Sequence, residues 1–329
     1  MNKLCQILNC KIPIIQGGMG NISNDILTAA VSEAGGLGTI GAGTMAPEEV
    51  KNIILNTKER TSKPFAVNIP IKVSAYTKEI MDVCVQMEIP VVTLSAGNPA
   101  PFIPYFHQQG MKVMTVCASV HQAKKAEEAG ADVIIGEGVE AAGINSPYET
   151  TTLALIPQMV QQVLVPVVAA GGISDGRSLA AMWMLGAQGV QMGTRFIATE
   201  DAPFHPLYKE KIIQANDTAT MMIGRSYGQL RRVLKTEYAE KLAGREKAGM
   251  SMEQYRYQTS ERFHHIGAIE GKESEGFMNA GQISGAIQDL PTVAELLKKM
   301  MHDAQQAINE ASNQYDPQHS SRLSSIKEL

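Results

Sequence analysis

Eight short apolar runs, each ending at glycine or a polar residue, limit the fold of this chain more than any other feature. They occupy residues 13–16, 36–40, 65–69, 91–95, 112–117, 132–136, 165–170 and 189–192. Stretches with helical spacing separate them, and one such stretch begins at Ala46 with Pro47 in its first turn. Continuous apolar strands are buried on both faces, which is typical of a parallel sheet covered by helices. Eight strand–helix units predict an α/β fold, the TIM (β/α)8 barrel.

The doubly wound α/β fold is the alternative, and the sequence argues against it. That fold has five or six strands and a glycine fingerprint after the first one. Gln16-Gly17-Gly18-Met19-Gly20 follows the first apolar run here, but it lacks the full spacing, and no acidic residue ends the second run.

The 329-residue chain changes character after the eighth run. Residues 200–275 are polar and rich in tyrosine, and they show helical spacing near 206–215 and 227–243. We therefore predict a barrel with its cofactor site at 1–199 and a small helical inserted lid or substrate domain at 200–275. Returning barrel helices at 276–312, with helical spacing over 277–287 and 292–308, and a disordered tail at 313–329 complete the prediction.

Charge and cysteine content exclude several classes of partner. The net charge is −4 and no basic stripe is present, so we expect no nucleic acid. Apolar stretches such as 163–170 are far shorter than the ~20 residues that span a bilayer, so we expect no membrane contact. The N-terminus lacks a secretory apolar core, and the four cysteines lack metal-type spacing. We expect a cytoplasmic protein with free thiols and no metal.

Glycines at the ends of the seventh and eighth runs point to a phosphate. Gly171-Gly172 and Gly193-Thr194 would expose backbone N–H groups where this fold binds phosphate. The other strand ends are small and neutral, at Gly18, Met19, Asn68, Ala96 and Gly97. Small, neutral residues at the open end of a barrel suit a flat aromatic cofactor, and flavin mononucleotide (FMN) fits such a site better than a sugar phosphate. Glu137 is the main acidic candidate there, with flavin contact and a structural hydrogen bond as competing roles.

These motifs resemble the nitronate monooxygenase family (2-nitropropane dioxygenases), which includes the FMN-dependent enoyl-acyl-carrier-protein reductase II. The resemblance spans roughly residues 4–310 and rests on Ile15-Gln16-Gly17-Gly18-Met19, Ala34-Gly35-Gly36-Leu37-Gly38, Pro64-Phe65-Ala66-Val67-Asn68, Gly97-Asn98-Pro99, Ala169-Ala170-Gly171-Gly172-Ile173, Gln191-Met192-Gly193-Thr194-Arg195-Phe196 and Ala280-Gly281-Gln282. The stretch 205–211 looks more like the reductase branch.

The resemblance implies which residues hold FMN. Gly18, Met19 and Asn68 would contact its ring or ribityl chain. A second group would hold the phosphate: Gly171, Gly172, Gly193 and Thr194. Further members of the implied cofactor-binding set are Gly97, Glu137, Gly143, Gln191 and Gln282. A homodimer is an expectation at the level of the family.

One position departs from the family pattern. Where the family reads Glu-Ala-Gly-Gly-His-x-Gly, this chain reads Glu140-Ala141-Ala142-Gly143-Ile144-Asn145-Ser146. Ile144 stands at the family histidine, which serves as the base in nitronate oxidation, and isoleucine can neither accept nor donate a proton. Asn145, Ser146 or Tyr148 could orient the substrate instead, a histidine from elsewhere could move in, or the reaction could need no base.

Two histidines and two arginines of the insertion are further candidates, each with a competing structural role. We expect His264 and His265 on the surface of the insertion, with catalysis from a lid as the alternative. Arg231 and Arg232 are expected on a solvated helix face, with phosphate recognition as the alternative.

The sequence thus predicts an FMN-dependent oxidoreductase that oxidises alkyl nitronates with O2, with NAD(P)H as a candidate co-substrate. An NAD(P)H-dependent enoyl thioester reductase is the first alternative, so the substrate is a small molecule or an acyl thioester. A flavin-binding protein without the usual catalysis is the second, because of Ile144. A flavin-free isomerase or aldolase would need a lysine or an acid–base pair at the strand ends, and none is found.

Overall fold

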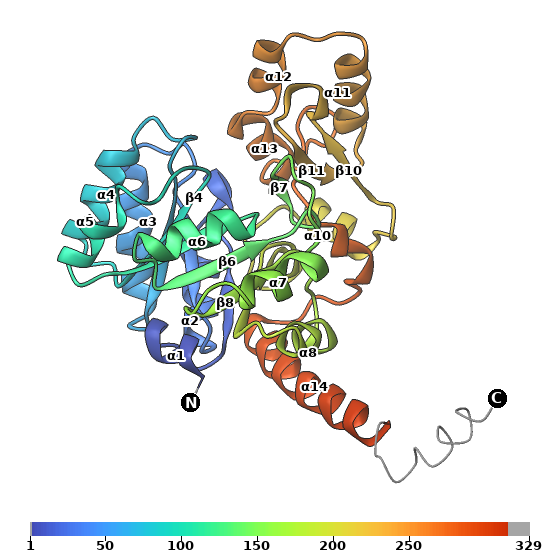
Figure 1. Cartoon of the computed structure of the whole chain (residues 1–329). Helices are drawn as coiled ribbons and strands as arrows, with labels where there is room; N and C mark the ends of the chain where they lie inside the picture. Colours follow the sequence, from blue (N-terminus) through green and yellow to red (C-terminus); the bar gives the residue numbers. More distant parts are fainter. Residues whose placement is uncertain (1, 315–329) are drawn as a thin grey trace.

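The computed structural model describes residues 2–314 and shows a closed parallel barrel with a segment standing above one end (Figure 1). The barrel strands are β1 (Ile14–Gln16), β2 (Gly38–Gly41), β3 (Phe65–Pro70), β4 (Val91–Ser95), β5 (Lys112–Cys117), β6 (Val133–Glu137), β8 (Val167–Ala170) and β9 (Gly189–Met192). They pair in parallel in the order β1-β9-β8-β6-β5-β4-β3-β2. A parallel bridge from Ile15 to Leu37 joins the two outer strands. The predicted TIM barrel is confirmed, and no strand end differs from its predicted position by more than two residues.

Helices surround the barrel because each buries one apolar face against the strands, and several of them begin at a capping residue or at proline. They are α2 (Asp25–Glu33), α3 (Pro47–Arg60), α4 (Thr77–Gln86), α5 (Ile103–Gln108), α6 (Val120–Glu128), α7 (Thr152–Val160) and α8 (Gly176–Met184). Asn24 caps α2 by accepting a hydrogen bond from the Leu27 N–H, and Pro47 occupies the first turn of α3.

The barrel interior is closed at its amino-terminal end by the short helix α1 (Lys3–Leu8). Leu4 and Leu8 are fully buried and pack with the inward-facing residues Ile15, Val91 and Met114. The end of the barrel where the strands finish is therefore the one that remains open.

The last helix, α14 (Val293–Gln314), packs against α8 and α2 and completes the helical ring, as predicted. The helix predicted over 277–287 is wrong. This stretch is extended and then forms the 3₁₀ helix η3 (Gln282–Ala286). Its backbone is paired, because the Leu234 N–H donates to the Met278 carbonyl, and its apolar residues Phe277, Met278 and Ala280 are buried. Of the predicted tail, residues 313 and 314 end α14, and the remainder lies outside the described residues.

The segment after β9 begins with α9 (Thr194–Ile197) and α10 (Pro206–Ile213). It continues through β10 (Thr220–Ile223), η2 (Arg225–Tyr227), β11 (Arg231–Leu234), α11 (Glu237–Lys247), α12 (Met252–Gln258) and α13 (Glu261–Ala268). The helix expected near 206–215 is present as α10. The segment also contains strands, and the helix predicted over 227–243 is instead β11 followed by α11. Two arginines within β11 break the apolar alternation by which a strand is normally detected.

The small sheet connects this segment to the barrel. Its order is β10-β11-β7, and β7 (Gly143–Ile144) comes from the loop between β6 and α7. Figure 1 shows α11, α12 and α13 grouped apart from the barrel helices, with β7 and β11 between the two parts. The segment has its own apolar cluster, which includes Ile223, Val233, Tyr255 and Phe277. No helix within residues 2–314 is both long and apolar enough to cross a membrane.

Candidate active site

A cavity of about 800 Å³ lies at the carboxyl ends of the barrel strands and is roofed by the inserted segment. Its volume falls in the upper part of the range typical of ligand sites. The predicted cofactor-binding residues that line it are Gly18, Met19, Asn68, Gly97, Glu137, Gly171, Gly172, Gln191, Gly193 and Thr194. The structure does not bring Gly143 and Gln282 to the cavity wall. Gly143 is buried in β7, and Gln282 is exposed with its N–H bonded to the Glu140 carbonyl.

The loops after β8 and β9 present bare backbone to one side of the cavity. Gly171 and Gly172 have φ values of 97° and 73°, which side-chain-bearing residues rarely adopt. A Cβ atom on Gly193 would have no atom within 4 Å, so the space above this residue is open. Within residues 2–314, no backbone acceptor engages the N–H groups of Gly171, Gly172 or Gly193. Because α8 is already capped by the Asp175 side chain, these loop amides are the donors left for an anion.

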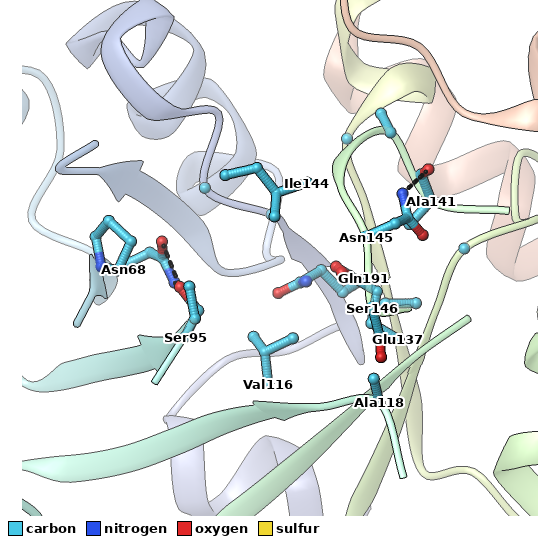
Figure 2. A pocket seen from close by; sticks show the side chains of 18 of the residues that line it. Asn68, Ser95, Val116, Ala118, Glu137, Ala141, Ile144, Asn145, Ser146 and Gln191 are labelled. Atoms are coloured by element: carbon cyan, nitrogen blue, oxygen red, sulfur yellow. Dashed lines mark hydrogen bonds between the residues drawn. The ribbon is translucent and has the colours of Figure 1, made fainter. Parts of the chain in front are cut away.

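The opposite side of the cavity floor is formed by fixed amide groups. The Asn68 Nδ2 lies 3.1 Å from Ser95 Oγ, which orients the amide. A Cβ atom on Gly18 would lie 2.7 Å from the Asn68 Cβ, so only glycine fits there. Ala96 has a φ of 50°, a strained conformation for a residue with a side chain. Figure 2 shows Asn68 and Ser95 on one side of the open space and Gln191 nearer its middle.

Glu137 at the end of β6 is the acidic residue of the floor. Burial raises the pKa of its carboxyl to about 7. A carboxyl whose pKa is raised by burial in a ligand cavity is a candidate functional residue. Its neighbour Glu140 has a structural role, because its carboxylate accepts hydrogen bonds from the N–H and Oγ1 of Thr152.

The loop that carries Ile144 offers no titratable group at the family histidine position. The Ile144 side chain is 48% exposed and borders the cavity, as Figure 2 shows. Asn145 also lines the cavity, but its Nδ2 donates to the carbonyls of Ala141 and Gly143, which holds the loop. Ser146 accepts from the Tyr148 N–H, and the Tyr148 ring is 62% exposed at the rim.

The cavity roof contains polar residues that the sequence reasoning missed or misplaced. They are Tyr208, Arg231, Glu261, His264 and Asn279, and all line the same cavity. We call these five residues the roof cluster. His265 is 50% exposed, as expected, but the prediction of a surface position for His264 is wrong, since it is 2% exposed. The spacing of His264, Gly267 and Ala268 along α13 matches one buried helix face, which is the signal that could have located it.

Arg231 and Arg232 likewise lie on a buried strand and not on a solvated helix face. The Arg231 guanidinium lies 5.0 Å from the centre of the Phe277 ring and donates to the Asn279 Oδ1 over 3.3 Å. The Arg232 Nε donates to the Val139 carbonyl, in the loop after β6.

Glu261 connects the roof cluster to the barrel. Its Oε2 lies 3.3 Å from the backbone nitrogen of Asn21, in the loop after β1. Burial alone would raise the pKa of this carboxyl, but the hydrogen bond and charge of His264 and the charge of Arg231 lower it to about 2. Glu261 is therefore a carboxylate throughout the physiological range.

Comparison with known proteins assigns the chain to a family. The family model described as nitronate monooxygenase matches residues 1–79 and 69–303. A probable nitronate monooxygenase from Staphylococcus saprophyticus is 34% identical, over 72% of this chain and 79% of that protein.

Two further relatives match over nearly the whole chain. A Mycobacterium tuberculosis protein, named as a dehydrogenase of a hydroxy-methyl-oxo-octahydro-indene-carboxyl-CoA, is 29% identical over 94% of this chain and 97% of its own. The structure of FabK from Thermotoga maritima has a TM-score of 0.89 and 37% identity, covering 95% of this chain and 99% of that one. The chain belongs to the nitronate monooxygenase family and is an oxidoreductase.

Proposed function

We propose that this oxidoreductase uses FMN bound at the carboxyl ends of the barrel strands. The observation that carries the proposal is the set of free backbone amides at Gly171, Gly172 and Gly193, beside a floor of uncharged amides. FMN, when bound, supplies two-electron chemistry that no side chain of this cavity could provide.

The chain's own residues orient and enclose the reactants. The glycine loops after β8 and β9 would hold the phosphate, and Asn68 and Gln191 would hydrogen-bond polar atoms of the ring system. The inserted segment covers part of the cavity with most of the roof cluster, and shielding of this part from water would strengthen electrostatic interactions there.

For the substrate we favour an enoyl thioester reduced at the expense of NAD(P)H. A relative named for a carboxyl-CoA substrate matches 94% of the chain, whereas the probable nitronate monooxygenases match 72–74% of it. The stretch 205–211, which resembles the reductase branch, forms most of α10 and contains the cavity residue Tyr208. We place this reaction in the cytoplasm, in keeping with the four free cysteines.

Nitronate oxidation is the second candidate, and the family model favours it. Ile144 sets a chemical limit on this candidate. An isoleucine cannot remove a proton from a neutral nitroalkane, so only a substrate that is already a nitronate anion could react without another base.

Spectroscopy and rapid mixing test the proposal in two stages. Purified protein, or protein incubated with FMN, should show flavin absorbance, and a colourless protein that fails to take up FMN contradicts the cofactor assignment. Anaerobic mixing with NADH or NADPH should bleach this absorbance. Crotonyl-CoA should then restore it faster than buffer does, whereas restoration only by O2 in the presence of propyl-2-nitronate would favour the second candidate.

A further inference from the structure

The reaction proposed above needs an acid that position 144 cannot supply, and the following inference rests on that proposed function. Reduction of an enoyl thioester adds a hydride equivalent at the β-carbon and a proton at the α-carbon. NAD(P)H supplies the hydride equivalent and becomes NAD(P)⁺, so the α-proton must come from a protein group or from water.

The imidazole of the roof cluster is held in a defined orientation at the cavity wall. The His264 ring stacks on Phe277, with centroids 5.3 Å apart and an interplanar angle of 5°. Its Nδ1 lies 3.5 Å from the Glu261 Oε2, and its Nε2 lies 3.3 Å from the Asn279 Nδ2. A carboxylate that accepts a hydrogen bond from one ring nitrogen fixes the orientation of an imidazole, which is an arrangement used in general acid–base catalysis.

This imidazole lies close to the strand that carries Ile144. In the small sheet, Ile144 pairs with Arg231, whose guanidinium contacts both Asn279 and Phe277. A Cβ atom on Gly143 would lie 3.6 Å from the Asn279 amide nitrogen. The roof cluster therefore adjoins the loop position at which the family places its histidine, although His264 itself lies 120 residues further along the chain.

We propose that His264 is the catalytic acid of this enzyme and replaces the absent histidine at position 144. In this step the protonated imidazole forms the new C–H bond at the α-carbon of the thioester. The N–H bond breaks, the electron pair remains on the imidazole nitrogen, and water then restores the proton. Glu261 is the positioning residue, because it accepts the Nδ1–H and so leaves the Nε2–H as the acid. The Asn279 Nδ2 donates to Nε2 once this proton has left.

The charges around the imidazole support this role. Glu261 faces the imidazole from the same helix as a carboxylate, and Arg231 on β11 lies 3.9 Å from this carboxylate. The Tyr208 hydroxyl, on α10, donates to the Asn279 carbonyl. His265, on the same helix, points elsewhere and lies 3.5 Å from Glu270. Glu137 on the floor is the competing acid, since its carboxyl also lines the cavity.

Substitution of adjacent histidines separates a catalytic from a structural role. His264→Phe keeps an aromatic ring for stacking, His264→Gln keeps hydrogen-bonding capacity, and His265→Phe is the matched control on the exposed side of α13. We expect both His264 variants to reduce crotonyl-CoA about 10²-fold or more slowly, in line with the loss of a general acid. Reduction by NAD(P)H and FMN retention should stay close to those of the parent. The melting temperature should fall, because Glu261 loses its buried partner, but it should stay above the assay temperature. His265→Phe should leave every readout unchanged.

Deuterium labelling gives a readout that a purely structural role would not move. In D2O the parent enzyme should place deuterium on one face of the α-carbon, whereas His264→Phe should give a mixture of epimers by NMR. The alkaline fall in the crotonyl-CoA rate of the parent should disappear in His264→Gln. Adding Ile144→His to His264→Phe should recover part of the rate, because it returns an imidazole to the family position.

The outcomes separate the two proposals. A parent protein that is reduced by neither NADH nor NADPH, or that does not reduce enoyl thioesters, overturns the proposed function and this role of His264 together. A parent that reduces them while both folded His264 variants keep its rate, pH profile and stereospecific labelling overturns the role of His264 alone. A loss of rate and labelling in Glu137→Gln, with His264→Phe unaffected, would assign the acid to the floor.

Discussion

The floor and the roof of the cavity recognise ligands by different physical means. The floor consists of strand ends that offer backbone N–H groups and neutral amides, with Glu137 as its acidic side chain. The roof cluster brings an arginine, a carboxylate and an imidazole into contact in a buried setting. The floor suits an extended cofactor that stays bound, whereas the roof suits a reacting group whose protonation changes. The site therefore divides binding and proton transfer between two parts of the chain.

The largest effect should follow from removing the ring that supports the roof. Phe277 is fully buried beneath both His264 and Arg231. Phe277→Ala should cost about 3–5 kcal/mol in the free energy of unfolding, measured by denaturant titration. Tyr257→Phe, at a ring that is 59% exposed, is the control and should change it by less than about 0.5 kcal/mol. If Phe277→Ala were equally mild, the roof would not depend on this packing.

Two glycines of the floor should respond differently to added side chains. At Gly171, φ is 97° and a Cβ atom would lie 3.0 Å from the Thr152 Oγ1, so Gly171→Val should both destabilise the fold by about 1–2 kcal/mol and weaken FMN binding.

At Gly193 a Cβ atom would have no other atom within 4 Å, so Gly193→Ala should leave stability unchanged. A fall in FMN affinity of about tenfold in Gly193→Ala, measured by fluorescence quenching, would show that the ligand occupies this space. Unchanged affinity would contradict a phosphate at Gly193.

Glu137 should make stability depend on pH. Its folded-state pKa of about 7 lies above the ordinary value of 4.5, so the folded protein prefers the protonated carboxyl. Stability from this group is present below pH 4.5 and is lost as the pH rises through 7. Because its side chain is only partly buried, we expect Glu137→Gln to gain about 1–2 kcal/mol at pH 8 and nothing at pH 4. Melting curves of both proteins across this range measure the effect, and a difference that is the same at both pH values would refute it.

The smallest effect should come from Tyr148, a candidate of the altered loop. Its ring is 62% exposed at the rim of the cavity. Tyr148→Phe should change the rate of crotonyl-CoA reduction by less than about twofold, because a solvated hydroxyl there contributes little. A loss of tenfold or more would return proton transfer to the loop and weaken the contrast between floor and roof.

The parts of the site that could be predicted from the sequence are those built by local patterns. Gly171, Gly172 and Gly193 could be placed at strand ends because each directly follows a continuous apolar run. The short strand β11 could not be predicted from the sequence, since Arg231 and Arg232 interrupt its apolar pattern. Its partner strand β7 has only two residues. Gly143 and Gln282 were placed in the cavity by resemblance, and neither lines it. A one-residue difference along a strand or turn decides whether a side chain faces a cavity.

The sequence alone determined the barrel, its open end and the absence of a proton-transfer group at Ile144, because these depend on periodicity and on residue identity. Only the tertiary structure decided that His264, Glu261 and Arg231 meet in the roof of the same cavity. Their positions in the chain carry no sign of one another, since the contact depends on how the inserted segment folds back over the strand ends. Local patterns specify elements, but the approach of distant side chains is specified by packing.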